Sequence, residues 1–191
     1  MIHSFKNDYS EGAHPAILEL LMQTNNQQHD GYGEDDYSSK AAGLIRKLIN
    51  NPHADIHFVS GGTQANAIGI SAMLNPYEAV ITADTGHINV HEAGAIEYRG
   101  HKVIAVESQD GKLACDQIET VLAGHTDEHM VKPRLVYLSN ATETGTIYQQ
   151  HELQDIAAFC RANNLYLYLD GARIGSALTA AQNDLTLPQV S

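Results

Sequence analysis

Asp170 and Arg173 stand three residues apart, directly after a run of five apolar and aromatic residues. This run, Leu165–Leu169, has the length and composition of a strand that is buried on both faces of a parallel sheet. Carboxylates are seldom buried without a partner, so Asp170 needs one at the end of the strand. It could cap a helix or pair with Arg173. It could instead hold the protonated ring nitrogen of a cofactor and keep that ring an electron sink.

A second motif places Gly61, Gly62 and Thr63 between an expected strand and an expected helix, within FVSGGTQANAIGI. A glycine turn lets backbone N–H groups approach an anion closely, and the N-terminus of a helix favours negative charge. A phosphate could bind these amides together with the hydroxyl of Ser60 or Thr63. The spacing matches neither the dinucleotide-binding fingerprint nor the P-loop. The alternative is a tight turn in which Thr63 caps the helix.

A third motif, DTGHINVHEAGAIE, contains His87 and His91 four residues apart, with Glu92 next to the second. On a helix the two imidazoles would share one face, as metal ligands can. The pattern is neither H-E-x-x-H nor H-x-x-E-H, and no cysteine lies nearby to complete a ligand set. The other interpretations are two surface histidines, or an imidazole stacked on a flat ligand.

The elements that would position these residues alternate along the chain. The sequence predicts strands at Ile56–Ser60, Ala79–Ala83, Lys102–Glu107, Arg134–Ser139 and Leu165–Leu169. It predicts helices at Thr63–Leu74, Val90–Tyr98, Asp116–Leu122 and His151–Asn163. Such alternation indicates an α/β domain with a mostly parallel sheet between helices. In these sheets ligands bind at the carboxyl ends of the strands, where Gly61, Gly62 and Asp170 are expected.

Two further helices are predicted before the first strand. HPAILELLMQ has helical apolar positions, with Pro15 suited to the first turn. KAAGLIRKLINN would follow a polar loop, with Ser38 or Ser39 as its N-cap. The chain thus has helices before its alternating part as well as within it.

Composition limits the classes of partner. Hydrophobic residues make up 43% of the chain and charged residues 18%, which describes a folded globular protein. The net charge of −12 disfavours a nucleic-acid partner. The sequence shows neither a signal peptide nor a membrane-spanning run, and two cysteines make no disulfide framework. We therefore expect a cytoplasmic protein with no membrane or nucleic-acid partner.

SGGT, HINVHEAGAIE and LYLDGARIGSAL, in this order and spacing, resemble the pyridoxal-phosphate enzymes of aspartate-aminotransferase fold, specifically the threonine aldolase and β-eliminating lyase group. GYGEDD resembles the tyrosine-glycine loop that precedes the first core helix in that group. The resemblance runs from about Asn7 to Leu187. It implies a three-layer αβα fold, the large domain of a pyridoxal-phosphate-dependent transferase, with pyridoxal 5′-phosphate as the cofactor and no metal.

The resemblance also implies a role for each matching residue. Gly62 and Thr63, with Gly61, would hold the cofactor phosphate. His87 would stack on the pyridine ring, Asp170 would pair with its nitrogen, and the fork of Arg173 would meet the substrate carboxylate. His87, Asp170 and Arg173 are thus the expected catalytic residues. Expected substrate contacts besides Arg173 are Asn7, Tyr32, His91 and Glu143.

The reaction implied is cleavage of the Cα–Cβ bond of a β-hydroxy amino acid such as threonine, giving glycine and an aldehyde. Aldolases of the group carry a histidine after the fourth predicted strand, where this chain has LSNATETG with Asn140, Thr142 and Glu143. The base that takes the hydroxyl proton could be His91, Glu143 or a water. Alternatives are β-elimination from an aromatic or sulfur amino acid, and an inactive relative that binds a phosphate ligand or a partner subunit.

In this group a lysine some tens of residues beyond DGAR binds the cofactor covalently. The six lysines here all precede Asp170, and none lies in a matching motif: Lys6, Lys40, Lys47, Lys102, Lys112 and Lys132. We therefore expect residues 1–14 to be an N-terminal segment and 15–191 a partial large domain, with the small C-terminal domain absent and the chain inactive alone. The complete enzyme is expected to be a homodimer or homotetramer.

Overall fold

The computed structural model describes residues 4 and 6–191. The chain divides into two compact units, Met1–Leu44 and Ile45–Ser191. In the first unit, α1 (Pro15–Thr24) begins at its proline, as expected. The next helix, α2 (Asp36–Leu48), begins in the first unit and ends in the second. The expected cap at Ser38 or Ser39 is wrong: the helix starts earlier because the Asp35 carboxylate accepts hydrogen bonds from the backbone N–H of Ser38 at 2.9 Å and from its hydroxyl at 2.7 Å.

The second unit contains a sheet of four strands, β1 (Glu78–Ala83), β2 (Val103–Val106), β3 (Lys132–Ser139) and β4 (Tyr166–Asp170). Their order is β2-β1-β3-β4, and every pair is parallel. Because the strands are parallel, their carboxyl ends lie along one edge of the sheet. This edge is where ligands bind in open α/β sheets.

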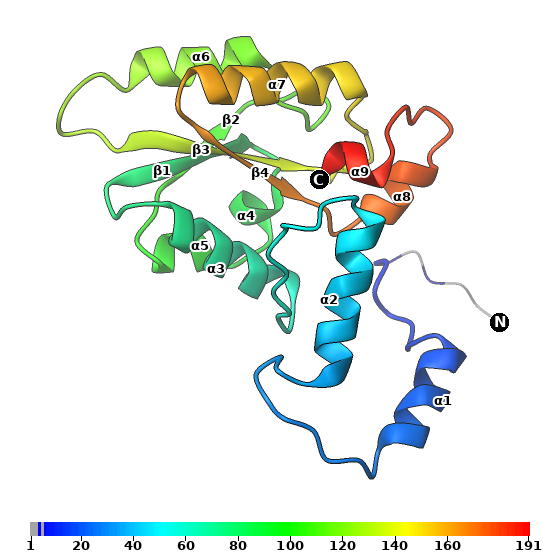
Figure 1. Ribbon diagram of the computed structural model, residues 1–191. Coiled ribbons are helices and arrows are strands. Elements are labelled where there is room, and N and C mark those ends of the chain that lie inside the picture. Colours follow the sequence, from blue (N-terminus) through cyan, green and yellow to red (C-terminus); the bar gives the residue numbers. More distant parts are fainter. Residues whose placement is uncertain (1–3, 5) are drawn as a thin grey trace. The chain divides into compact units, whose positions relative to one another are not determined.

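Helices cover both faces of the sheet, as Figure 1 shows. On one face lie α6 (Cys115–Gly124) and α7 (Gln150–Ala162), and on the other α3 (Gly62–Met73), α4 (His87–Val90) and α5 (Ala95–Tyr98). Two short helices, α8 (Ile174–Thr179) and α9 (Leu187–Val190), follow β4. This is the expected three-layer arrangement. Among the described residues, no helix is both long and apolar enough to cross a membrane.

Each face of the sheet has its own apolar core. Ile81 and Val136 point to the side of α6 and α7, where they pack with Ile118 and Ile156. Their strand neighbours Val80 and Leu135 point to the other side, where they pack with Ile70 of α3, Ile88 of α4 and Ile96 of α5. Successive side chains in a strand face opposite ways, so strands covered on both sides must be apolar throughout.

Two expected elements differ from the structure. Ile56–Ser60 is not a strand, because no described strand pairs with it and its Phe58 and Val59 are exposed. The expected helix Val90–Tyr98 is interrupted, since Ala93 and Gly94 adopt φ of 49° and 75° between α4 and α5. A helix cannot continue through left-handed backbone, so two short helices form instead.

Candidate active site

The carboxyl edge of the sheet brings together residues that are far apart in sequence. Asp170 is the last residue of β4, and Ser139, the last residue of β3, lies beside it in register. The backbone N–H of Asn140 donates to the Asp170 carbonyl at 3.0 Å. His87 opens α4, four residues after the end of β1. Asp170 and His87, which the sequence singled out, thus both lie at the edge where a parallel sheet binds its ligands.

The Asp170 carboxylate lies in a network of donors. Its Oδ2 accepts from the Tyr137 hydroxyl at 2.5 Å and from Asn66 Nδ2 at 3.2 Å, and its Oδ1 accepts from the backbone N–H of Ala172 at 2.9 Å. A carboxylate offers about four lone-pair sites, and these three bonds from described residues fill three of them. Asp170 is not the N-cap of α8, a place that Arg173 takes.

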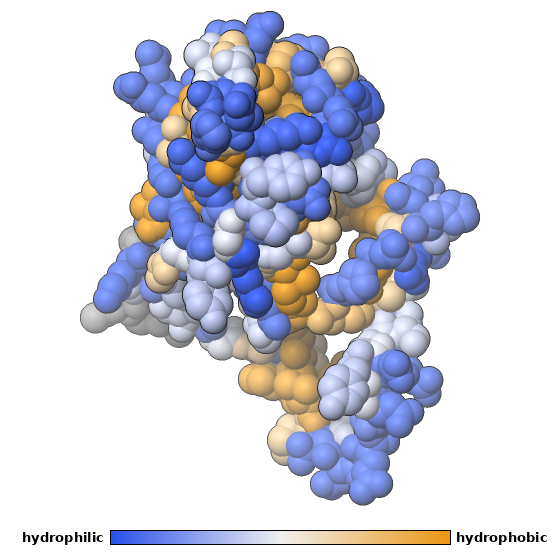
Figure 2. Space-filling view, turned by 90° about the vertical axis from the view of Figure 1, so that its left-hand side faces the viewer, coloured by the Kyte–Doolittle hydropathy of each residue, from blue (hydrophilic) through white to orange (hydrophobic). Residues whose placement is uncertain are grey.

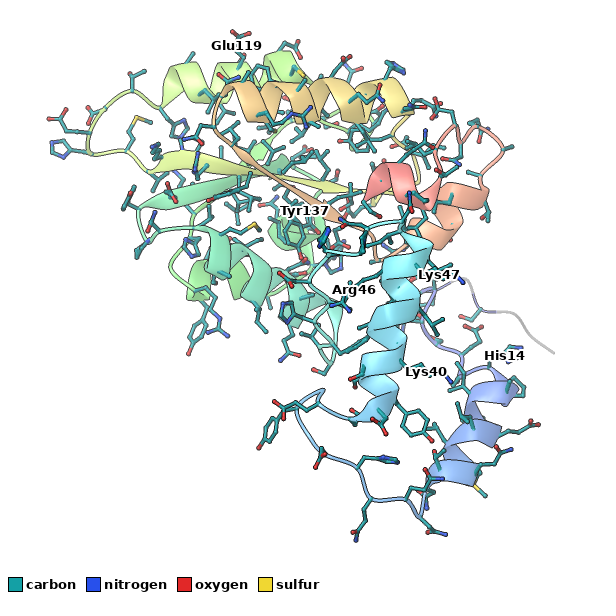
Figure 3. The ribbon with its side chains drawn as sticks, in the orientation of Figure 1. His14, Lys40, Arg46, Lys47, Glu119 and Tyr137 are labelled. Carbon is teal, nitrogen blue, oxygen red and sulfur yellow. The ribbon has the colours of Figure 1, made fainter. Side chains whose placement is uncertain are left out.

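Tyr137 is a buried phenol of β3 whose ring lies between the sheet and α3 (Figure 3). It stacks on Tyr168, with ring centroids 5.5 Å apart and planes 14° from parallel. Burial and the adjacent charge of Asp170 raise the pKa of Tyr137 far above its usual value. The phenol therefore stays protonated and donates to Asp170 at neutral pH.

His87 is held through both its backbone and its ring. Its backbone N–H donates to Glu143 Oε1 at 3.0 Å, and the Ser139 hydroxyl donates to the same oxygen at 2.7 Å. Its ring Nδ1 lies 3.0 Å from Glu92 Oε1. The exposed ring of His91 is next to it, with centroids 5.5 Å apart and a tilt of 52°. Glu143 and the two histidines, which the sequence proposed separately, therefore form one cluster.

The sequence left open that His87 and His91 are metal ligands. Within residues 4 and 6–191, no three histidine, cysteine, aspartate or glutamate side chains are placed to hold a metal ion. His87 and His91 do share a side of the chain, as the four-residue spacing indicated. Their neighbour Glu92 contacts the ring of His87 and is buried among other polar side chains.

The N-terminus of α3 is open. Gly61 is its N-cap and no side chain caps it, so Thr63 does not act as the alternative cap. A Cβ built on Gly61 or Gly62 would meet no atom within 4 Å. The Ser60 hydroxyl donates to Gln64 Oε1 at 2.7 Å. Uncapped N–H groups beside open space are a suitable site for an anion.

Three expected substrate contacts, Arg173, Asn7 and Tyr32, stay predictions. Arg173 is half-buried at the start of α8. Asn7 and Tyr32 belong to the first compact unit, where Asn7 Oδ1 accepts from the Tyr9 backbone N–H at 3.2 Å and the side chain of Tyr32 is fully exposed. The approach of Asn7 and Tyr32 to the Asp170 cluster stays a prediction.

Sequence reasoning missed three side chains of the cluster, Asn66, Tyr137 and Ser139, and it noted Glu92 without assigning it a role. Each is a polar residue within a helix or strand, or next to a histidine, and such residues are easily taken as solvent-facing. The available signal was that Asn66 and Tyr137 interrupt otherwise apolar segments, where a buried polar group must find partners.

Comparison with known proteins identifies the family. The sequence profile of the family described as beta-eliminating lyase matches residues 8–186. The chain belongs to the beta-eliminating lyase family. The chain is 33% identical over 175 residues to the low specificity L-threonine aldolase of Pseudomonas aeruginosa. The matched region covers 91% of the chain and 50% of that relative. It is 54% identical to a Leishmania major threonine aldolase of known structure, with a TM-score of 0.95 over 96% of the chain and 54% of the other.

More distant structures bear on the fold alone. An archaeal alanine:glyoxylate aminotransferase shares 16% identity and a TM-score of 0.72, over 92% of this lyase-family chain and 44% of its own length. The likeness confirms the expected fold, that of the large domain of pyridoxal-phosphate-dependent transferases. The chain spans about half the length of two curated relatives that it matches.

Proposed function

We propose that the complete protein is a pyridoxal-phosphate-dependent lyase that cleaves the Cα–Cβ bond of β-hydroxy amino acids such as threonine, giving glycine and an aldehyde. The observation that carries the proposal is the Asp170 carboxylate, which three donors hold beside the His87 cluster. The likeness to threonine aldolases supports it.

The residues present fit pyridoxal phosphate. The uncapped N-terminus of α3, with Gly61, Gly62 and Thr63, would hold the phosphate. His87 would cover the pyridine ring, and the Asp170 carboxylate would take the ring N–H. When bound, the cofactor supplies an electron sink for the charge left on the substrate Cα.

We assign the hydroxyl proton of the substrate to Glu143. Its Oε1 is fixed by the backbone N–H of His87 and by the Ser139 hydroxyl, and these two bonds orient the carboxylate. An ionised carboxylate only accepts hydrogen bonds, so Oε2 is suited to receive this proton. His91, the other candidate side chain, is exposed and packs its ring beside that of His87.

Glu143→Gln is therefore expected to lower kcat for threonine at least about tenfold, because general-base catalysis contributes a hundredfold or more in many enzymes. His91→Asn, the control, should stay within about threefold of the wild type. Steady-state kinetics of the two purified variants decide the matter. The reverse order of effects would move the base to His91.

The reaction itself is tested with the complete protein, saturated with pyridoxal phosphate. Incubation with threonine should release acetaldehyde and glycine in equal amounts. Pyruvate from an aromatic or sulfur-containing amino acid, without acetaldehyde from threonine, would establish β-elimination instead. Cofactor binding without either product would indicate an inactive relative.

Arg173→Lys is expected to raise the KM for threonine about tenfold with a smaller change in kcat. A planar guanidinium binds a carboxylate through two parallel hydrogen bonds, and an ammonium group cannot reproduce them. Initial rates over a range of threonine concentrations measure both constants. An unchanged KM would remove Arg173 from the substrate site.

We further propose that the complete enzyme is a cytoplasmic homodimer or homotetramer. All of α1 lacks buried residues, and its apolar side chains are exposed: Ile17, Leu18, Leu20, Leu21 and Met22. Figure 2 shows apolar surface in its lower part, at the height of α1 in Figure 1. Contiguous apolar surface of this kind is typical of protein interfaces. Sedimentation velocity should give at least a dimer, and a fully active monomer would contradict the proposal.

A further inference from the structure

An unbroken chain of hydrogen bonds connects the two side chains that the proposed function places on the cofactor. Asn66 of α3 donates through Nδ2 to Asp170 Oδ2 at 3.2 Å and to Glu92 Oε1 at 2.6 Å. The same Glu92 oxygen lies 3.0 Å from Nδ1 of His87. The residues connected in this way come from α3, from β4 and from the segment around α4. Asn66 and Glu92 are the bridging pair.

The stability of the fold does not explain why Glu92 is a glutamate. Its side chain is fully buried, and its Oε2 has no hydrogen-bond partner among the described residues. Burying a carboxylate is costly, and apolar residues of similar size in such places are often neutral or stabilising. The other oxygen, by contrast, faces two donors, Asn66 and His87. The carboxylate is therefore placed to order its neighbours.

The donors and acceptors of the chain are determined by its own network. The Tyr168 hydroxyl donates to Asn66 Oδ1 at 2.9 Å, and burial, with the charges of Asp170 and Glu92, raises the pKa of Tyr168 to about 12. The amide oxygen of Asn66 thus faces Tyr168, and its N–H₂ group faces the two carboxylates. A carboxylate can only accept, so the hydrogen in the contact between Glu92 and His87 lies on Nδ1 of the imidazole.

We propose that Asn66 and Glu92 are positioning residues, which set the orientations of His87 and Asp170 together and keep a hydrogen on Nδ1 of the His87 ring. This inference rests on the proposed function, because it concerns the same cofactor site. With Nδ1 anchored, the imidazole plane cannot turn freely. The ring face and the Asp170 carboxylate are then held ready for a flat cationic ring between them.

The tautomer of His87 gives a test that does not depend on activity. The complete protein, labelled with 15N-histidine and free of cofactor, is compared with Glu92→Leu and Glu92→Gln by two-bond 1H–15N correlation spectra, with His87→Asn to assign the signal. The wild type should show hydrogen on Nδ1. Glu92→Leu removes the acceptor and should lose that state, whereas Glu92→Gln keeps an oxygen that can accept both bonds and should retain it.

Cofactor affinity is the second readout. Glu92→Leu should raise the Kd for pyridoxal phosphate at least about tenfold, and Glu92→Gln should stay within about 1.5-fold of the wild type. Glu78→Leu is the matched control, since Glu78 is an equally buried glutamate at the start of β1, at the opposite edge of the sheet. It should affect thermal stability but neither the His87 tautomer nor the Kd.

If Glu92→Leu does not fold, a milder variant tests the proposal. Tyr168→Phe removes only the hydroxyl that fixes the Asn66 amide, and it should raise the Kd about threefold. The proposal is overturned if Glu92→Leu, or Tyr168→Phe in its place, keeps both the wild-type tautomer and the wild-type Kd. It is also overturned if Glu92→Gln loses the Nδ1 hydrogen as Glu92→Leu does. A wild type that shows the Nδ1 hydrogen but binds no pyridoxal phosphate would instead refute the proposed function.

Discussion

Asp170→Asn is expected to reduce kcat for threonine cleavage at least tenfold, which corresponds to about 1.4 kcal/mol in the activation barrier. Asparagine has nearly the same shape but no charge, so it cannot stabilise a protonated ring nitrogen and the cofactor becomes a poorer electron sink. It also offers one oxygen to a set of donors that bind two, namely Tyr137, Asn66 and the Ala172 backbone N–H. Steady-state kinetics with saturating pyridoxal phosphate measure the loss.

Some loss of stability accompanies this substitution, because a donor left unpaired in a half-buried site costs about 1–3 kcal/mol. Circular dichroism at the assay temperature must therefore show that the variant is folded. Asp155→Asn is the matched control, since it removes the same charge from an exposed position on α7 and should leave kcat unchanged. Near-normal turnover of Asp170→Asn with bound cofactor would remove Asp170 from its assigned role.

Borohydride reduction of the complete protein with pyridoxal phosphate is expected to label one lysine, and none of the six within residues 1–191. Lys102 and Lys132 lie at the amino ends of β2 and β3, across the sheet from the Asp170 edge. Lys112 is bound to Glu152 at 2.5 Å and lies 5.8 Å from the centroid of the Tyr148 ring. A covalent link needs a free amine beside the cofactor aldehyde, which these three positions do not supply.

Peptide mass mapping after digestion locates the label. Sparse modification of exposed lysines is expected as background, and pyridoxamine phosphate, which has no aldehyde, should give no label at all. Stoichiometric modification of any single lysine among Lys6, Lys40, Lys47, Lys102, Lys112 and Lys132 would show that this chain carries its own link to the cofactor.

The sheet could be predicted from the sequence because its strands are short apolar runs. The expectation that Leu165–Leu169 is buried on both faces was wrong, since β4 is an outer strand of the described sheet and its residues are only half-buried or exposed. β1 and β3 are almost fully buried, and this leaves a clear pattern in the residues. Ile56–Ser60 has a similar composition but no partner strand, and pairing is a tertiary property that composition does not encode. The break between α4 and α5 arises from the left-handed backbone of Ala93 and Gly94. The residues around them have a helical pattern, so the sequence did not reveal this break.

The candidate site was predictable only where a residue follows an element that fixes its place. Asp170 comes at the end of a strand and Gly62 at the start of a helix, so both positions followed from the elements. Glu92 and Asn66 have no such marker. Asn66 meets Glu92 across 26 residues and Asp170 across 104, and a single sequence gives no sign of contacts at that separation.

That separation of 104 residues also has a consequence for how the protein is made. Chains emerge from the ribosome N-terminus first, at roughly 5–20 residues per second. Asn66 and Glu92 are therefore synthesised well before Asp170, which joins their network through β4. Long-range parallel pairing is slow because the loop must close before contacts form. The proposed site for pyridoxal phosphate therefore cannot be complete before β4 has paired with β3, because Asp170 arrives with that strand.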